Sequence, residues 1–370
     1  MEKIKTEKPN LGLIFEKLRE THRVIGPKLE NDTIVLTEIE FGDLPSGVTD
    51  IQAPGCYKLR NNKREDVIFS FSHGPHSFKS FLNPATAELS LFRRSRRGVS
   101  VQALSEEERP FAFIGARACD LAALGLLDKV FLEGPVIDRW YSRRRKDIFI
   151  VAVNCNHPGG NCFCDSMGTG PEVTSGFDLS LTEIDEYFLV DAGTAAGEQL
   201  IEGIPSSGVT DGDLEKKAAR LLDCRNNMAK SMETTDLPGV LYRNMEHPRW
   251  AEIELRDLEC GNCTMVCPTC FCSSTYDFVP AAGISPNLKE LAGVRMRHWD
   301  SCFSKNFARV HGGNFRRSRK ARYRHWMTHK LGYWIDQFGS PGCVGCGRCI
   351  TWCPVGLDIT HELAEIRHVR

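Results

Sequence analysis

Near its C-terminus the chain reads Cys343-Val344-Gly345-Cys346-Gly347-Arg348-Cys349-Ile350-Thr351-Trp352-Cys353-Pro354, which has the spacing C-x2-C-x2-C-x3-C-P. Three closely spaced cysteines of this kind wrap one corner of a cubane iron–sulfur cluster. The fourth, followed by proline, ligates the other cluster in proteins that hold two. Zinc is the alternative, but zinc sites favour separated C-x2-C pairs. The stretch therefore predicts iron–sulfur ligation.

A second copy of the motif lies about ninety residues upstream, with one substitution. Residues 257–268 read Asp-Leu-Glu-Cys-Gly-Asn-Cys-Thr-Met-Val-Cys-Pro, so Asp257 stands where the first cysteine is expected. Exchange of the fourth ligand between the motifs predicts two ligand sets. We name them site one (Cys343, Cys346, Cys349 and Cys267) and site two (Cys260, Cys263, Cys353 and a fourth ligand).

Asp257 is the geometric choice for that fourth ligand of site two. A carboxylate can bind iron, although it is a harder donor than a thiolate and should hold its corner less firmly. The alternatives are a cysteine from elsewhere (Cys270, Cys272 or Cys302), a three-iron cluster with an empty corner, or an Asp257 that only caps a turn. The spacing favours ligation by Asp257.

Another group of cysteines lies in a glycine-rich loop, where Cys155, Cys162 and Cys164 fall within ten residues. The segment Cys162-Phe163-Cys164 is repeated in kind at residues 270–272. This repetition suggests a third cluster, whose candidate ligands are Cys155, Cys162 and Cys164 with one of Cys270, Cys272 or Cys302; Cys119 is a further candidate. The alternative is that they are small buried residues, as free cysteines often are. Cys56 and Cys224 are expected to be structural.

The chain divides by composition near residue 250 into two predicted domains. Residues 1–250 are expected to form a mixed α/β domain that contains the Cys-rich glycine loop (155–171). Its clearest unit is a strand at 111–115, a helix at 120–127 and an apolar strand at 148–153, as in a buried parallel sheet. Further strands are predicted at 67–71 and 181–190. Residues 251–370 are expected to be a mainly helical domain around two [4Fe-4S] clusters.

Composition narrows the classes of function. The chain has 370 residues, 16 cysteines and a formal net charge of −1. The N-terminus shows no signal peptide and no apolar run is long enough to span a membrane, so we expect a cytoplasmic protein in which cysteines serve metals rather than disulfides. Its basic runs lack a nucleic-acid-binding motif, and we expect the stretch at 316–334 to be a docking surface. No catalytic constellation, flavin site or nucleotide site is recognised.

Several motifs follow one another in a familiar order: 52–55 (Gln-Ala-Pro-Gly), 115–120 (Gly-Ala-Arg-Ala-Cys-Asp), 162–171, 261–270 and 343–354. In this the chain resembles the beta, or electron-transfer, subunits of cytosolic sulfhydrogenases and nickel–iron hydrogenases, and is equally similar to the corresponding iron–sulfur subunit of anaerobic sulfite reductase. The resemblance covers nearly the whole chain. It implies a dicluster-ferredoxin C-terminal domain and a place in an anaerobic oxidoreductase complex. Asp257 departs from the pattern, where the family leads us to expect cysteine.

The predicted function is therefore electron transfer. The resemblance implies a hetero-oligomer in which this chain relays single electrons between a flavin/NAD(P)-linked component and a catalytic redox subunit. That catalytic partner would be a hydrogenase, a sulfite or sulfur reductase or a heterodisulfide-reductase-type subunit, and this chain would perform no bond chemistry. The alternative is an enzyme that reduces a substrate at a cluster in the Cys155–Cys164 loop.

Overall fold

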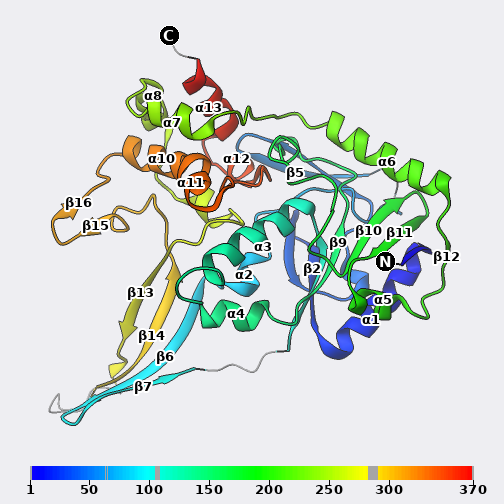
Figure 1. The fold of residues 1–370 in the computed structure, drawn as a ribbon, viewed down its shortest axis with the longest axis horizontal. Helices are drawn as coiled ribbons and strands as arrows, with labels where there is room; N and C mark the ends of the chain where they lie inside the picture. The colour runs from blue at the N-terminus through cyan, green and yellow to red at the C-terminus, as the bar shows by residue number, and fades with distance from the viewer. Residues whose placement is uncertain (1, 63, 65, 105–108, 282–290, 369–370) are drawn as a thin grey trace.

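A computed structural model describes residues 2–62, 64, 66–104, 109–281 and 291–368 (Figure 1). The first part of the chain is built on a large mixed sheet. Its strands lie in the order β12 (Ser207–Gly208), β1 (Lys3–Glu7), β11 (Tyr187–Ala192), β10 (Leu179–Ile184), β9 (Phe149–Val153), β8 (Phe111–Ala116), β2 (Arg23–Glu30) and β3 (Thr33–Glu38). The central strands β2, β8, β9 and β10 are parallel, and the flanking strands pair antiparallel.

Alternation along β8 and β9 places apolar side chains on both faces of this sheet. Ala112 and Ile114 pack in one layer with α1 (Leu11–Thr21) and α5 (Ala195–Ile201). Phe111 and Phe113 pack in the opposite layer with α2 (Lys79–Leu82), α3 (Ala118–Phe131) and α4 (Arg139–Arg145). The predicted strand–helix–strand unit corresponds to β8, α3 and β9, and it forms the centre of an α/β layer architecture.

Two of the predicted strands differ in the structure. Residues 67–71 form no strand; their backbone instead turns toward a buried carboxylate, because Glu183 accepts hydrogen bonds from Ile68 N (2.8 Å) and Phe69 N (2.9 Å). The strand predicted at 181–190 is a hairpin, since Asp185 has a positive φ of 40° and separates β10 from β11. Charged turn residues in an apolar run marked this break, but the run itself suggested continuity.

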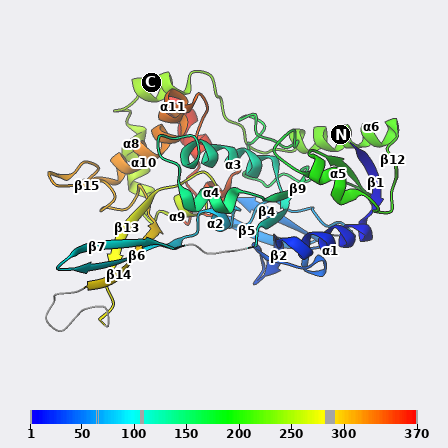
Figure 2. The same cartoon turned by 60° about the horizontal axis from the view of Figure 1, so that its bottom comes forward.

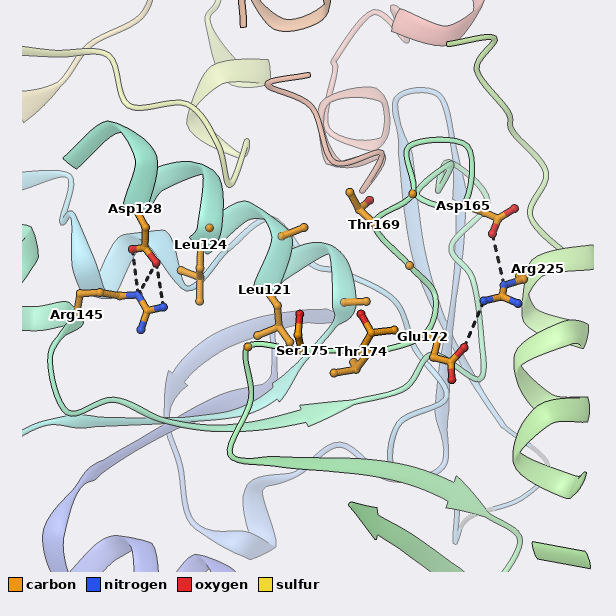
Figure 3. A pocket seen from close by; sticks show the side chains of 17 residues that line it. Leu121, Leu124, Asp128, Arg145, Asp165, Thr169, Glu172, Thr174, Ser175 and Arg225 are labelled. Carbon is orange, nitrogen blue, oxygen red and sulfur yellow. Dashed lines mark hydrogen bonds and ion pairs between the residues drawn. The ribbon is translucent and has the colours of Figure 1, made fainter. Parts of the chain in front are cut away.

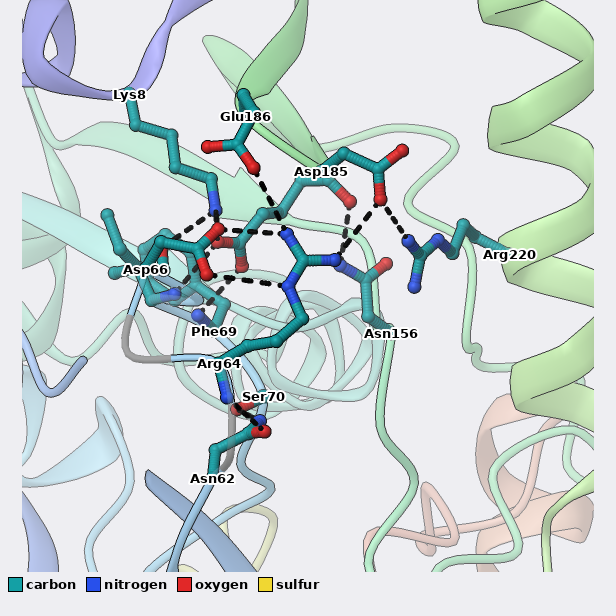
Figure 4. A network of polar contacts seen from close by, with 12 residues as sticks. Lys8, Asn62, Arg64, Asp66, Phe69, Ser70, Asn156, Asp185, Glu186 and Arg220 are labelled. Carbon is teal, nitrogen blue, oxygen red and sulfur yellow. Dashed lines mark hydrogen bonds and ion pairs between the residues drawn. The ribbon is translucent and has the colours of Figure 1, made fainter. Parts of the chain in front are cut away.

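A polar network ties the β10–β11 turn to neighbouring segments (Figure 4). Arg64 contacts Asp66 (2.9 Å) and Asp185 (3.2 Å), and Arg220 contacts Asp185 from helix α6 (Asp211–Asn226) at 2.9 Å. Helix α6 begins at a capping box in which Thr210 and Asp213 exchange hydrogen bonds. The network holds α6 against the sheet, so the chain that follows it starts from a fixed position.

The second part of the chain contains helices α7 (Leu237–Arg243), α8 (Arg249–Arg256), α9 (Asn262–Met265), α10 (Arg319–Thr328), α11 (Trp334–Phe338), α12 (Arg348–Thr351) and α13 (Ile359–Arg367), with a π-helical segment at His329–Tyr333. The expectation of a mainly helical domain over 251–370 is not confirmed. That segment also forms β13 (Ser273–Phe278), β14 (Leu291–Trp299), β15 (Arg309–Val310) and β16 (Gly313–Asn314).

Strands from both parts of the chain share a smaller antiparallel sheet, ordered β13-β14-β6-β7. Strand β14 pairs with β6 (Thr86–Ser95), and β6 pairs with β7 (Gly98–Ala103). Figures 1 and 2 show this sheet as an arm that projects from the body of the molecule. A hairpin of the first predicted domain is thus joined by hydrogen bonds to the second.

The two parts also meet beside the C-terminal motif. The hairpin of β4 (Val48–Ala53) and β5 (Cys56–Asn61) stacks Tyr57 on Trp352, with ring centroids 5.0 Å apart. Gly55 N donates to Ile350 O at 3.0 Å, and a Cβ at Gly55 would lie 2.8 Å from the Cys353 carbonyl. This close approach explains the turn glycine of the predicted 52–55 motif. Within the described residues, no helix is long and apolar enough to cross a membrane.

The stretch at 316–334, expected to be a docking surface, lies largely inside the protein. Helix α10 packs against α7 and α8, and its side chains close over the cysteine motifs. The buried members are Arg322, Tyr323, Trp326, Met327, Thr328, Lys330, Leu331 and Trp334. Its basic composition therefore serves internal ion pairs, such as Arg322 with Glu259 at 2.5 Å.

Candidate iron–sulfur centres

The two cysteine motifs form matching turns. In each, a Cys-Gly-x-Cys segment starts a one-turn helix, and the glycine before the helix is left-handed: Gly261 (φ 72°) precedes α9 and Gly347 (φ 74°) precedes α12. A Cβ at Gly347 would lie 2.4 Å from the carbonyl oxygen of Asn161. Glycine is therefore required there both by conformation and by the close approach of the first domain.

The structure brings the predicted members of site one together in a buried setting. Burial, followed by the charges of the other three cysteines of the set, raises the pKa of Cys349 well above its ordinary value. Burial likewise raises the pKa of Cys343 to about 12. Buried thiols with raised pKa values lose their protons when a metal supplies the compensating charge. The arrangement fits metal ligation by the whole set.

Two buried lysines surround Cys267 of site one. Lys330 Nζ donates to Cys267 Sγ at 3.2 Å, and Lys79 Nζ donates to the carbonyl oxygens of Cys267 (2.9 Å) and Cys270 (3.1 Å). The hydrogen bond from Cys270 and the charge of Lys330 hold the pKa of Cys267 well below its ordinary value. Sequence reasoning missed both lysines, because nothing local in the sequence marks a lysine whose partner is distant.

Arg348 forms the opposite wall of site one and interacts with Cys346. It donates to Asp120 Oδ1 (3.0 Å) and contacts His73 Nδ1 (3.1 Å), while His73 Nε2 lies 2.9 Å from Cys119 Sγ. Burial and the charge of Arg348 lower the pKa of His73 to about 3. Because the arginine and the thiol already engage both ring nitrogens, this cluster is a hydrogen-bonded support for site one rather than a cation site.

Site two is a small cavity lined by Asp257, Cys260, Cys263 and Cys353, with Cys349 of site one at its edge. Tyr323 and Trp326 of α10 also line this cavity. Burial, followed by the charges of Cys353, Asp257 and Cys260, raises the pKa of Cys263 well above its ordinary value. The structure thus brings together the set that ligand exchange predicts.

Asp257 lies at the C-terminal end of α8 and is only 6% exposed. Its Oδ1 accepts a hydrogen bond from Glu259 N at 2.9 Å, but its buried Oδ2 has no hydrogen-bond partner among the described residues. Burial raises the pKa of this carboxyl group. A buried carboxylate oxygen without a partner is costly unless something else binds it. The residue therefore fits the position of a metal ligand.

The rival cysteines are engaged with one another. Cys270 hydrogen-bonds Cys267, and Cys302 hydrogen-bonds Cys272, which lowers the pKa of Cys272 to about 7. Cys302 also interacts with Cys263 of site two. The cysteines at 270–272 are therefore neighbours of the two C-terminal sites.

The loop after β9 places Cys155, Cys162 and Cys164 close together. The charges that raise the pKa of Cys164, after burial, are those of Cys155, Cys162, Cys224 and Cys346, in that order. Cys224, expected to be structural, projects from α6 into this group and is fully buried. Its spacing from the buried Leu221 marks an inward helix face, but sequence alone does not reveal what that face meets.

A cavity of about 630 Å³ opens between α3 and the loop at 165–176, beside Cys164 (Figure 3). Arg225, next to Cys224, pairs with Asp165 and Glu172 of this loop, each at 3.4 Å. On the far side, Arg145 pairs with Asp128 at 3.0 Å. These ion pairs hold α6 and α3 on the two sides of the cysteine loop.

The sulfur spacing distinguishes a cluster from a single ion. Four thiolates around one zinc ion lie about 3.8 Å apart, given Zn–S bonds near 2.3 Å. Among the described residues, no group of three cysteine sulfurs lies within 4.8 Å; the group that meets this distance is His73, Cys119 and Asp120. Wider sets fit a polynuclear cluster, in which each thiolate binds a different iron.

Comparison with known proteins agrees with this chemistry. Residues 256–357 match the 4Fe-4S dicluster domain family. Over 362 residues the chain is 31% identical to the sulfhydrogenase 2 subunit beta of Pyrococcus furiosus, and the match covers 95% of each chain. No solved structure matches the chain significantly. The C-terminal part is therefore a 4Fe-4S dicluster domain.

Proposed function

This chain belongs to the family of sulfhydrogenase beta subunits, and from that membership we propose that it is a relay for single electrons. It would connect a flavin- or NAD(P)-linked subunit with a catalytic redox subunit in a hetero-oligomer. The observation that supports this most directly is the placement of site two beside site one, with Cys349 at the edge of the site-two cavity. A [4Fe-4S] cluster bound at each site would supply one-electron chemistry.

The residues of the two sites divide the work. The site-one cysteines would hold one cluster, and the backbone turns at Gly345 and Gly347 direct amides toward it. The cysteines of site two would hold the other cluster, with Asp257 as its fourth ligand. Lys330 and Arg348 place positive charge at site one, which stabilises additional negative charge there. They should raise the reduction potential of site one relative to site two.

Site two lies nearer the surface. Cys260 is exposed, and apolar residues that surround it are also open to solvent: Leu255 (83% exposed), Leu258 (57%) and Val355 (38%). Exposed apolar patches beside a polar site mark interaction surfaces. We assign this face to contact with a redox partner, so that electrons would enter or leave the chain there.

The test is a redox titration of the anaerobically purified full chain, followed by EPR. The relay predicts two one-electron signals from the C-terminal sites and no turnover of sulfite or polysulfide with a reduced dye. Substrate reduction by the chain alone would favour the alternative, an enzyme that acts at the Cys155–Cys164 loop. A chain that binds zinc and no iron would contradict both.

A further inference from the structure

Four thiols gather in the first domain, outside the dicluster domain. Cys155, Cys162 and Cys164 come from the loop after β9, and Cys224 comes from α6. Cys162, Cys164 and Cys224 are 6%, 5% and 0% exposed, and all four thiols are free of disulfides. Packing alone does not require four cysteines from two separate elements to meet at one point.

Each member of this group interacts with every other. Cys164 is affected by the charges of Cys155, Cys162 and Cys224. Cys224 is affected in turn by Cys155 and Cys162, and Cys162 by Cys155. All six pairs are therefore close enough for electrostatic coupling, although their sulfurs are too widely spaced for a single ion. That combination fits the four corners of a cubane.

The surroundings suit a negatively charged cluster. Arg117 is 3% exposed and hydrogen-bonds Cys155, while its guanidinium also donates to Phe71 O at 3.0 Å. The same residue precedes α3, a helix of fourteen residues whose N-terminus carries partial positive charge. Gly170 packs so closely that a Cβ there would lie 3.0 Å from Cys164 Sγ. Charge and backbone space are thus both provided at the thiols.

We propose that these four cysteines, named site three, bind a third [4Fe-4S] cluster that exchanges single electrons with the cluster at site one. The proposal extends the relay and rests on it. It replaces the sequence-based candidates for the fourth ligand (Cys270, Cys272 and Cys302) with Cys224.

Site three is in direct contact with site one. Cys162 Sγ lies 3.8 Å from the carbonyl oxygen of Cys346, and Phe163 N donates to Gly345 O at 2.8 Å. A Cβ at Gly345 would lie 2.6 Å from Phe163 O, so no side chain could be placed between the two backbones. One electron leaving the reduced cluster at either site would pass to the oxidised cluster at the other across this contact, without a proton or a bond change.

The test is iron and sulfide analysis of the full chain, purified or reconstituted without oxygen. We expect about twelve irons per chain for the wild type and about eight for Cys224→Ala, four for each cluster. Cys162→Ala should show the same loss. Cys119→Ala is the matched control, since this buried neighbour belongs to the His73 network, and it should retain about twelve.

The outcomes separate this inference from the proposed function. About eight irons in both the wild type and Cys224→Ala, with the signals of sites one and two intact, would overturn site three and leave the relay standing. Loss of iron in Cys119→Ala but not in Cys224→Ala would also overturn the ligand set. Loss of every signal in Cys224→Ala would point to misfolding, and Cys224→Ser then decides: retained signals of sites one and two with four irons missing support the proposal, and unchanged iron overturns it.

Discussion

Site one and site two are built on the same Cys-Gly-x-Cys turn, yet their surroundings differ. Site one lies between both parts of the chain, with Lys330 on one side and Arg348 on the other. Site two has an exposed cysteine, Cys260, and a buried carboxylate, Asp257. The comparison teaches that motif spacing determines where ligands lie, whereas distant segments determine the charge and solvent access that tune them.

The largest effect should come from removing a site-one cysteine. Cys346→Ala is expected to lose about four irons and to destabilise the fold, because its carbonyl and thiol lie where both parts of the chain meet. Iron analysis and thermal unfolding measure both effects. The control is Cys56→Ala, on β5, which should change neither. Equal stability losses in Cys346→Ala and Cys260→Ala would break the distinction between the buried and exposed sites.

The next test concerns the carboxylate of site two. Asp257→Cys should keep the iron count and change the EPR spectrum and potential of one cluster, since thiolate is the softer donor. Asp257→Ala should leave a three-iron cluster after mild oxidation. Glu252→Gln, an exposed change on the same helix, is the control. An unchanged spectrum in Asp257→Cys would mean that Asp257 does not touch iron.

Acid should affect both sites, because α10 and the segment after it contact both. His325 and His329 stack 5.8 Å apart, and burial lowers the pKa of His329 to about 4. An unfolded histidine binds a proton below about pH 6.5, so stability should fall by about 1 kcal/mol per pH unit between pH 6.5 and 4. His329→Gln should show a shallower decline in unfolding temperature over that range. Parallel profiles for the two proteins would contradict this expectation.

The smallest effect is electrostatic. Lys330→Met removes a charged hydrogen bond to Cys267, a contact worth about 1.5 kcal/mol, or about 60 mV for a one-electron couple. The potential of site one should therefore fall while that of site two stays constant. Lys320→Met, which removes an exposed ion pair with Glu246, is the control. A shift at site two instead would reverse the two site assignments.

Local patterns in the sequence predicted much of this structure. Ligand spacing anticipated which cysteines would meet at sites one and two, and apolar periodicity identified β8, α3 and β9. The hairpin hidden in residues 181–190 was missed, because two polar residues within an apolar run were read as part of a strand. Cys224 and Lys330 were missed for another reason: each acts through a contact far away along the chain, which no local pattern encodes.

The shared sheet of the arm has a consequence for synthesis. Strand β6 pairs with β14, whose residues follow it by about 200 positions, as in the pair of Arg94 with Leu291. At about 5 to 20 residues per second, β6 would wait about 10 to 40 seconds on the ribosome for its partner. During that interval the β6–β7 hairpin exposes an unpaired edge, which invites chaperones or premature pairing with another chain.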